Sequence, residues 1–183
     1  MSLFSSVKAP QGQQWMVVDK IRVPDIEELA YRYLPDLELT QLFLGTPYEH
    51  LNEIGPVAFK YTAVKEFEML LSKENDIRTS SVLFSVAEEK DQEMLIQHLQ
   101  ALHYVIVDGS PMFFRFYSVP TWDGLTIEQL TEDDINTVLG PFDSLSWIGA
   151  GLIVNTINRK LNNKNKEIEF PYNLTSEIFK MLV

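Results

Sequence analysis

The segment Ser80-Ser81-Val82-Leu83-Phe84-Ser85-Val86 contains no charged residue, and its only polar side chains are small hydroxyls. Aliphatic and aromatic residues of this kind favour β-strands, and a strand that is apolar on both faces lies inside a sheet that is covered on both sides. We therefore predict that residues 80–86 form a central strand.

The sequence on either side of this segment alternates between strand patterns and helix patterns. Strands are predicted over 14–18, 39–44, 57–61, 104–107, 112–117 and 167–170, with one or two more over 145–157 around Gly149-Ala150-Gly151; helices are predicted over 25–33, 51–54, 64–72, 91–102, 131–139 and from about 175 onward. Interleaved strands and helices are typical of an α/β protein. We predict a mixed β-sheet flanked by helices.

The helix predicted over 91–102 has the clearest amphipathic pattern. Its buried stripe is predicted to consist of Met94, Leu95, Leu99 and Leu102, because these residues recur at helical spacing.

Further along the chain, Thr131 is predicted to cap the helix that Gly140-Pro141 ends, and Asn173 or Thr175 is predicted to cap the last helix. The apolar pattern of that last helix is still running at Val183. We therefore expect an α/β region over 1–172 and, over 173–183, the beginning of a C-terminal helical region that is cut short.

The composition excludes several classes of function. The chain has 183 residues, with 15 Lys+Arg against 26 Asp+Glu and a net charge of −11. Nucleic acids and anionic membranes bind clustered basic residues, so neither is an expected partner. Cysteine is absent, which excludes thiolate catalysis and cysteine-based metal sites. The sequence has no signal peptide and no membrane-length apolar run, so we expect a cytoplasmic protein.

No catalytic motif is present in the sequence. It has no Gly-x-Ser-x-Gly, no phosphate-binding loop and no His-Glu-x-x-His. His98 and His103 are five residues apart, which does not place them on one helix face. Acid pairs such as Glu27-Glu28 and Asp133-Asp134 are typical of solvated helix faces. We expect no catalytic residue, no metal, no cofactor and no small-molecule substrate.

The segment Met112-Phe113-Phe114-Arg115-Phe116-Tyr117 is the most unusual in composition. On a strand, Phe113, Arg115 and Tyr117 share one face, while Phe114 and Phe116 share the other. Exposed aromatics on a strand are also a feature of RNA-recognition motifs, but the glycines of that motif are absent. We predict a central strand with both faces covered.

Arg115 needs a partner within such a strand, because a buried unpaired guanidinium is very costly. Asp19, at the end of the first predicted strand, is a candidate partner. Two roles remain open for Arg115: a structural ion pair, or part of a binding cleft.

Several motifs, in their order along the chain, resemble one bacterial family. They are Val17-Val18-Asp19, Leu42-Phe43-Leu44-Gly45-Thr46-Pro47-Tyr48-Glu49-His50-Leu51, Ile54-Gly55-Pro56-Val57, Gln97-His98-Leu99, Asp108-Gly109, Phe114-Arg115-Phe116-Tyr117, Leu130-Thr131 and Val138-Leu139-Gly140-Pro141-Phe142. This set, within residues 14–147, resembles the adaptor chaperones of type VI secretion effectors, also called Tap or TEC. The chain has Ser118-Val119-Pro120 where that family usually continues with Asp-Pro, which puts a polar role at that point in doubt.

The resemblance implies a non-catalytic protein. Such adaptors bind a toxic effector in the donor cytoplasm and help load it onto the VgrG spike. It also implies an α/β N-terminal lobe followed by a helical C-terminal lobe. Candidate partner-binding residues are Arg115 and Tyr117, together with the aromatics predicted in or near loops, namely Trp122, Phe142 and Trp147. The alternative for those three aromatics is that they close the edge of the core.

Two other functions stay open from the sequence. An acidic globular chain of this size is compatible with an immunity-type inhibitor that blocks one toxin. A small hydrolase is the other alternative, and it requires several of the scattered acids to meet in one pocket.

Overall fold

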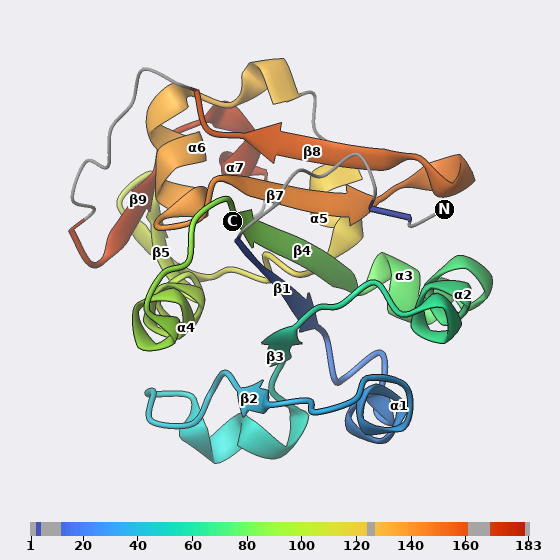
Figure 1. Cartoon of the computed structure of the whole chain (residues 1–183). Helices are drawn as coiled ribbons and strands as arrows, with labels where there is room; N and C mark the ends of the chain where they lie inside the picture. Colours follow the sequence, from blue (N-terminus) through green and yellow to red (C-terminus); the bar gives the residue numbers. More distant parts are fainter. Residues whose placement is uncertain (1–2, 5–11, 124–126, 161–168, 182–183) are drawn as a thin grey trace.

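The computed structural model describes residues 3–4, 12–123, 127–160 and 169–181 (Figure 1). The strands are β1 (Gln13–Val18), β2 (Leu39–Gln41), β3 (Val57–Lys60), β4 (Ser81–Val86), β5 (Tyr104–Val107), β6 (Ser110–Phe113), β7 (Ser144–Ile148), β8 (Val154–Asn158) and β9 (Tyr172–Leu174). The helices are α1 (Ile26–Tyr33), η1 (Glu49–Ile54), α2 (Lys65–Lys73), α3 (Asn75–Thr79), α4 (Gln92–Ala101), α5 (Val119–Asp123), η2 (Ile127–Gln129), α6 (Glu132–Leu139), η3 (Ala150–Leu152) and α7 (Glu177–Lys180). No helix in these ranges is long and apolar enough to cross a membrane.

β4 lies inside a six-stranded sheet with the order β2-β3-β1-β4-β7-β8. All six of its residues are buried, and it pairs antiparallel with β1 on one side and β7 on the other. The prediction of a central strand is therefore confirmed. Each pair of neighbours in this sheet is antiparallel.

The two faces of the six-stranded sheet support two separate apolar layers. Alternate residues of one strand point to opposite faces. Trp15 of β1 and Phe84 of β4 lie in a large cluster with α4, α5, α6 and the second sheet. Met16 and Leu83, their neighbours in sequence, lie in a smaller cluster with α1, α2 and α3. Figure 1 shows helices on both sides of the sheet, which confirms the predicted α/β class.

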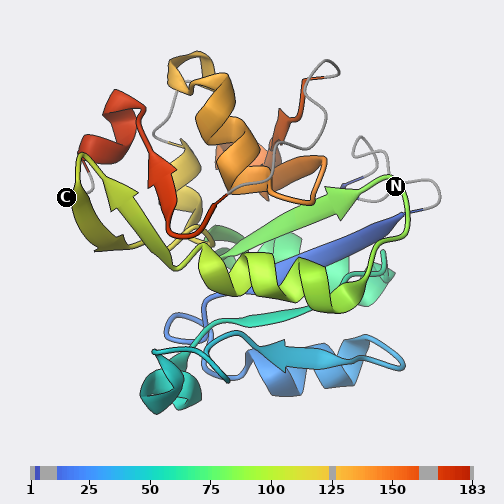
Figure 2. The ribbon, with the colours of Figure 1, turned by 90° about the vertical axis from the view of Figure 1, so that its left-hand side faces the viewer.

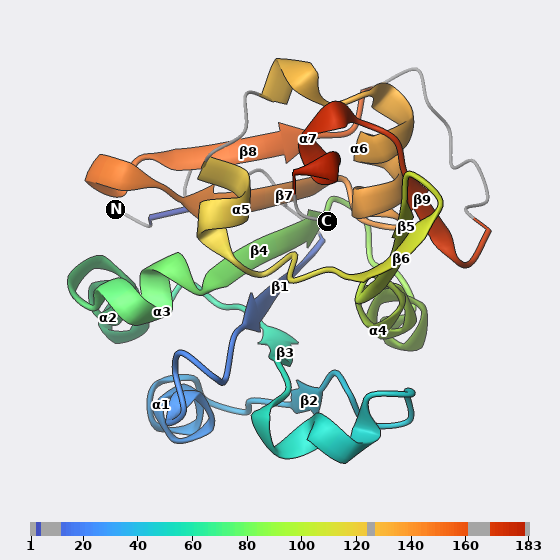
Figure 3. The ribbon, with the colours of Figure 1, turned by 180° about the vertical axis from the view of Figure 1, so that it is seen from behind.

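A second, three-stranded sheet has the order β6-β5-β9, and Figure 3 shows it beside α6 and α7. β5 and β6 form a hairpin, and β9 pairs parallel with β5. The prediction of a central strand over 112–117 is wrong. β6 ends at Phe113, and it is an edge strand because it pairs with β5 on one side only. The chain then turns, with the Ser118 N–H donating to the Arg115 carbonyl at 3.0 Å.

The predicted strand over 39–44 is shorter than expected, because β2 ends at Gln41.

The prediction of a strand over 167–170 is wrong where the structure describes it. Residues 167 and 168 lie outside the described residues, and Glu169 and Phe170 are not in a strand. The strand begins at Tyr172 instead, where it pairs with β5. Around Gly149-Ala150-Gly151 the chain forms two strands, β7 and β8, which agrees with one of the two expected arrangements.

Two helix predictions need correction, and one cap is confirmed. Met94 of α4 is exposed, although it was predicted in the buried stripe, and His98 is buried although it was not predicted there. The Thr131 hydroxyl accepts a hydrogen bond from the Asp134 N–H and caps α6, as predicted. Neither Asn173 nor Thr175 caps the last helix, since α7 begins after Ser176.

Residues 173–181 are attached to α6 through the buried carboxylate of Asp134. This carboxylate accepts hydrogen bonds from the Thr175 N–H at 2.9 Å, from the Ser176 N–H at 2.6 Å and from the Ser176 hydroxyl. The Ser176 hydroxyl also accepts from the Thr131 N–H at 3.0 Å. Buried carboxylate hydrogen bonds of this type are strong because the acceptor is charged. The division of the chain at residue 172 stays a prediction.

We expect Asp134→Ala to lower the free energy of unfolding by about 2–4 kcal/mol, because it leaves buried N–H groups without an acceptor. The matched control is Asp133→Ala, a substitution of an exposed acid in the same helical turn, with an expected loss under about 1 kcal/mol. Urea unfolding measures both. Equal losses for the two variants would contradict the role assigned to Asp134.

Candidate interaction surface

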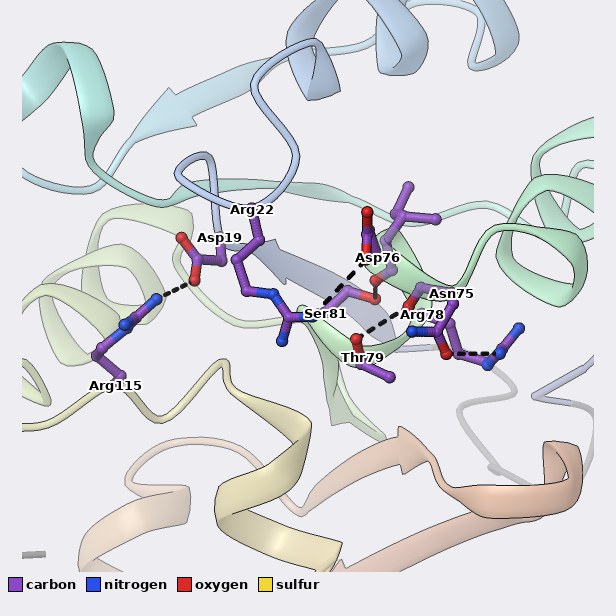
Figure 4. A network of polar contacts seen from close by, with 9 residues as sticks. Asp19, Arg22, Asn75, Asp76, Arg78, Thr79, Ser81 and Arg115 are labelled. Atoms are coloured by element: carbon purple, nitrogen blue, oxygen red, sulfur yellow. Dashed lines mark hydrogen bonds and ion pairs between the residues drawn. The ribbon is translucent and has the colours of Figure 1, made fainter.

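Arg115 and Asp19 form an ion pair that joins the two sheets. Asp19 directly follows β1 and is only 2% exposed. Its carboxylate accepts hydrogen bonds from the Ile21 N–H at 3.0 Å and from the Arg115 guanidinium. Figure 4 shows this pair beside the contact between Arg22 and Asp76. The predicted partner of Arg115 is therefore confirmed.

The environment of Arg115 favours its charged form. Partial burial acts to lower its pKa, but the hydrogen bond and the negative charge of Asp19 raise it, and the net shift is upward. The guanidinium carbon lies 6.0 Å from the centroid of the Tyr117 ring. Burial, followed by the charge of Asp19, raises the pKa of Tyr117. Tyr117 itself is buried, whereas the Arg115 side chain is 45% exposed.

The three other predicted partner-binding aromatics lie in the main core. The Trp122 indole donates to the Phe116 carbonyl at 2.6 Å, and the Trp147 indole donates to an Asp123 carboxylate oxygen at 2.8 Å. The Phe142 ring packs 4.9 Å, centroid to centroid, from Phe84. Trp122, Phe142 and Trp147 are all buried, so none of them presents its ring at the surface of this structure. This matches the alternative in which they close the core.

A different set of aromatic residues does lie at the surface. Phe113, at the end of β6, is 39% exposed, and its ring centroid lies 5.1 Å from that of Tyr48, which is half-buried. Tyr104 of β5 is the register partner of Phe113, so the two side chains point to the same face of the small sheet. Phe170 lies 6.0 Å from Tyr104, between ring centroids. We call these four residues, Tyr48, Tyr104, Phe113 and Phe170, the aromatic surface.

The aromatic surface rests on two buried rings. Phe43 lies 6.0 Å and His103 lies 5.6 Å from Phe113, between ring centroids. Gly55 makes the position of Phe43 possible, because a Cβ at Gly55 would lie 2.5 Å from the Phe43 ring. Residues 43, 55 and 103 thus build one support beneath the aromatic surface.

His103 is neutral in this support. Its Nδ1 lies 3.1 Å from the Gln100 carbonyl oxygen, while its buried Nε2 has no hydrogen-bond partner. Burial lowers the pKa of His103 to about 4. The neutral ring therefore packs as another aromatic residue under Phe113.

Sequence reasoning identified Phe113 as unusual but missed Tyr48, Tyr104 and Phe170 as surface residues. The available signal was the hairpin register, which places Tyr104 opposite Phe113 on the face away from buried Val105 and Val107. The contact of Tyr48 with Phe113 had no local signal, because the 64 intervening residues include three complete strands and four helices.

Within the described ranges, no group of three or more His, Asp or Glu residues is placed to hold a metal ion. The two acids of the pair Glu27-Glu28 bind different cations: Glu27 forms an ion pair with Lys20, and Glu28 forms one with Arg32.

The comparison with known families identifies the class of protein. Residues 14–130 match the family described as Domain of unknown function (DUF4123), so the chain belongs to that family. This is the type VI secretion effector chaperone or adaptor family, Tap or TEC, which confirms the resemblance drawn from the sequence. The match includes Arg115, Tyr117 and most of the aromatic surface, and it ends before α6. No curated protein and no solved structure matches the chain.

We expect Arg115→Ala to lower the free energy of unfolding by about 1–3 kcal/mol, because it leaves the buried Asp19 carboxylate without its cation. The loss is smaller than for a fully buried pair, since water reaches the guanidinium. Arg32→Ala removes an exposed pair with Glu28 and should cost under about 0.5 kcal/mol. Urea unfolding of both variants checks this expectation, and a loss for Arg115→Ala no larger than for Arg32→Ala would contradict it.

We also expect stability to fall in mild acid. Burial lowers the pKa of both His98 and His103 from 6.5 to about 4. Between these pH values the unfolded chain binds protons that the folded chain excludes. The free energy of unfolding therefore decreases as the pH falls from about 6.5 to about 4, by up to about 1.4 kcal/mol per pH unit for each histidine.

The measurement is the free energy of unfolding against pH for the native chain and for His103→Leu. His98 and His103 together steepen the dependence of the unfolding free energy on pH between pH 6.5 and 4. The His103→Leu variant should lose up to half of this added slope. His50→Gln, a substitution at an exposed histidine, is the control. An unchanged slope in His103→Leu would show that His103 does not exclude the proton.

Proposed function

We propose that this protein is a non-catalytic adaptor that binds a type VI secretion effector in the donor cytoplasm and helps load it onto the VgrG spike. Membership of the adaptor family over residues 14–130 carries this proposal. An adaptor acts through protein contacts, and exposed aromatic side chains on a supported surface are typical of residues that anchor such contacts.

The charge and the surface of the chain are compatible with this role. A net charge of −11 keeps the free adaptor soluble and favours encounter with a basic partner. The aromatic surface lies almost wholly within the family region, whereas Phe142 and Trp147 lie outside it and in the core. We therefore assign the partner contacts to the aromatic surface, with Arg115 and Tyr117 holding the adjoining segment in place.

The test is affinity purification of the tagged protein from its own host, followed by mass spectrometry of the retained proteins. We expect to recover a large toxin together with VgrG. A host strain that lacks VgrG serves as the control, and it should still yield the toxin, because the proposal has the adaptor bind the effector directly.

Other outcomes would overturn the proposal. Recovery of a toxin alone, with its activity suppressed in the complex, would indicate an immunity-type inhibitor. Recovery of no specific protein would remove the adaptor function and direct the search to a substrate.

A further inference from the structure

A shallow, open groove of about 490 Å³ lies between β2 and α4. Figure 2 looks onto this part of the molecule, with α4 crossing in front of the main sheet above β2 and the small sheet near the end of α4. Thr40 lines one wall, and Glu93, Ile96 and Gln97 line the other. Ile96 is the one aliphatic residue in the lining, and the other lining residues are polar or acidic.

The groove is linked to the aromatic surface through Gln100 and Leu44. Gln100, another lining residue, donates a hydrogen bond from its side chain to the Leu44 carbonyl at 2.9 Å. Leu44 is exposed, and it precedes the turn that leads to Tyr48. An extended or helical segment lying in the groove would thus continue over Leu44 onto Tyr48 and Phe113.

The two chain segments that build this face have charge of one sign. Residues 33–59 and 91–114 contain no lysine or arginine, and their acids are Asp36, Glu38, Glu49, Glu53, Asp91, Glu93 and Asp108. Four cations directly flank these segments, namely Arg32, Lys60, Lys90 and Arg115. Arg32 pairs with Glu28, Arg115 pairs with Asp19, and Lys90 donates to the Pro141 carbonyl. Lys60 lies over the Trp15 ring, and Lys20, farther along the chain, pairs with Glu27.

We infer that this face binds a lysine- and arginine-rich segment of a partner protein that also carries large apolar side chains along one side. The apolar side chains would pack on Phe113, Tyr48 and Tyr104, and the cations would face the acids of the groove. Cations also bind favourably to exposed aromatic rings. A second copy of this chain is a poorer occupant, because two molecules of charge −11 repel each other.

The inference rests on the proposed adaptor function and specifies the chemistry of the client segment. The probe is a labelled synthetic peptide of leucine and lysine, spaced to form an amphipathic helix, with binding followed by fluorescence anisotropy. Two matched peptides carry glutamate in place of lysine or serine in place of leucine. We expect each matched peptide to bind at least about tenfold more weakly than the leucine–lysine peptide.

Two pairs of variants locate the binding. Phe113→Ser should weaken binding about tenfold, whereas Met69→Ser, at an exposed site on α2, should not. Glu53→Gln with Glu93→Gln should weaken it about threefold or more, whereas Glu66→Gln with Glu74→Gln should not. The charge variants change exposed residues only, so they test the surface even if Phe113→Ser unfolds.

Equal binding by all variants, or no preference for the leucine–lysine peptide, would overturn the inference. That result leaves the adaptor function standing if the host purification still yields toxin and VgrG. Conversely, selective peptide binding without recovery of a toxin would refute the adaptor function while the chemistry of the face holds.

Discussion

The ion pair between Arg115 and Asp19 joins residues that are 96 positions apart and fixes how the two sheets meet. Asp19 sits at the end of β1, next to the centre of the main sheet, and its carboxylate is almost fully buried. A buried carboxylate requires a cation or several donors, and Arg115 supplies the cation. The Phe114 N–H still donates to the His103 carbonyl at 3.0 Å, and the chain then turns away from the small sheet with Arg115 paired to Asp19.

Buried and exposed aromatic residues separate at this point of the chain. Beyond Phe113 the chain sends Phe114 and Phe116 into the main core, where Phe114 packs against Trp122 and Phe116 against Phe84. Phe113 stays on the outside, over His103 and Phe43. The ion pair thus lies beside the point where the chain passes from an exposed aromatic residue, Phe113, to the buried Phe114 and Phe116.

Much of the fold was predictable because it depends on local signals. β4 is apolar throughout, so its position inside the sheet follows from the need to cover both faces. Thr131 is followed by a helix and accepts the expected capping bond. The order of motifs along the chain also identified the family without reference to any contact. The errors on Met94 and on the strand after Met112 arose where neighbours distant in sequence set the burial.

The sequence alone established the class of fold, the central strand, most element boundaries and the family, because each depends on residue types at short spacing. It also indicated Asp19 as the partner of Arg115, because a guanidinium in a buried segment needs a carboxylate. Only the tertiary structure decided that Trp122, Phe142 and Trp147 are core residues and that Tyr48, Tyr104, Phe113 and Phe170 form a surface. The physical reason is that the exposure of an aromatic side chain depends on which elements pack over it, and η1, β5, β6 and the segment before β9 meet only in the folded chain.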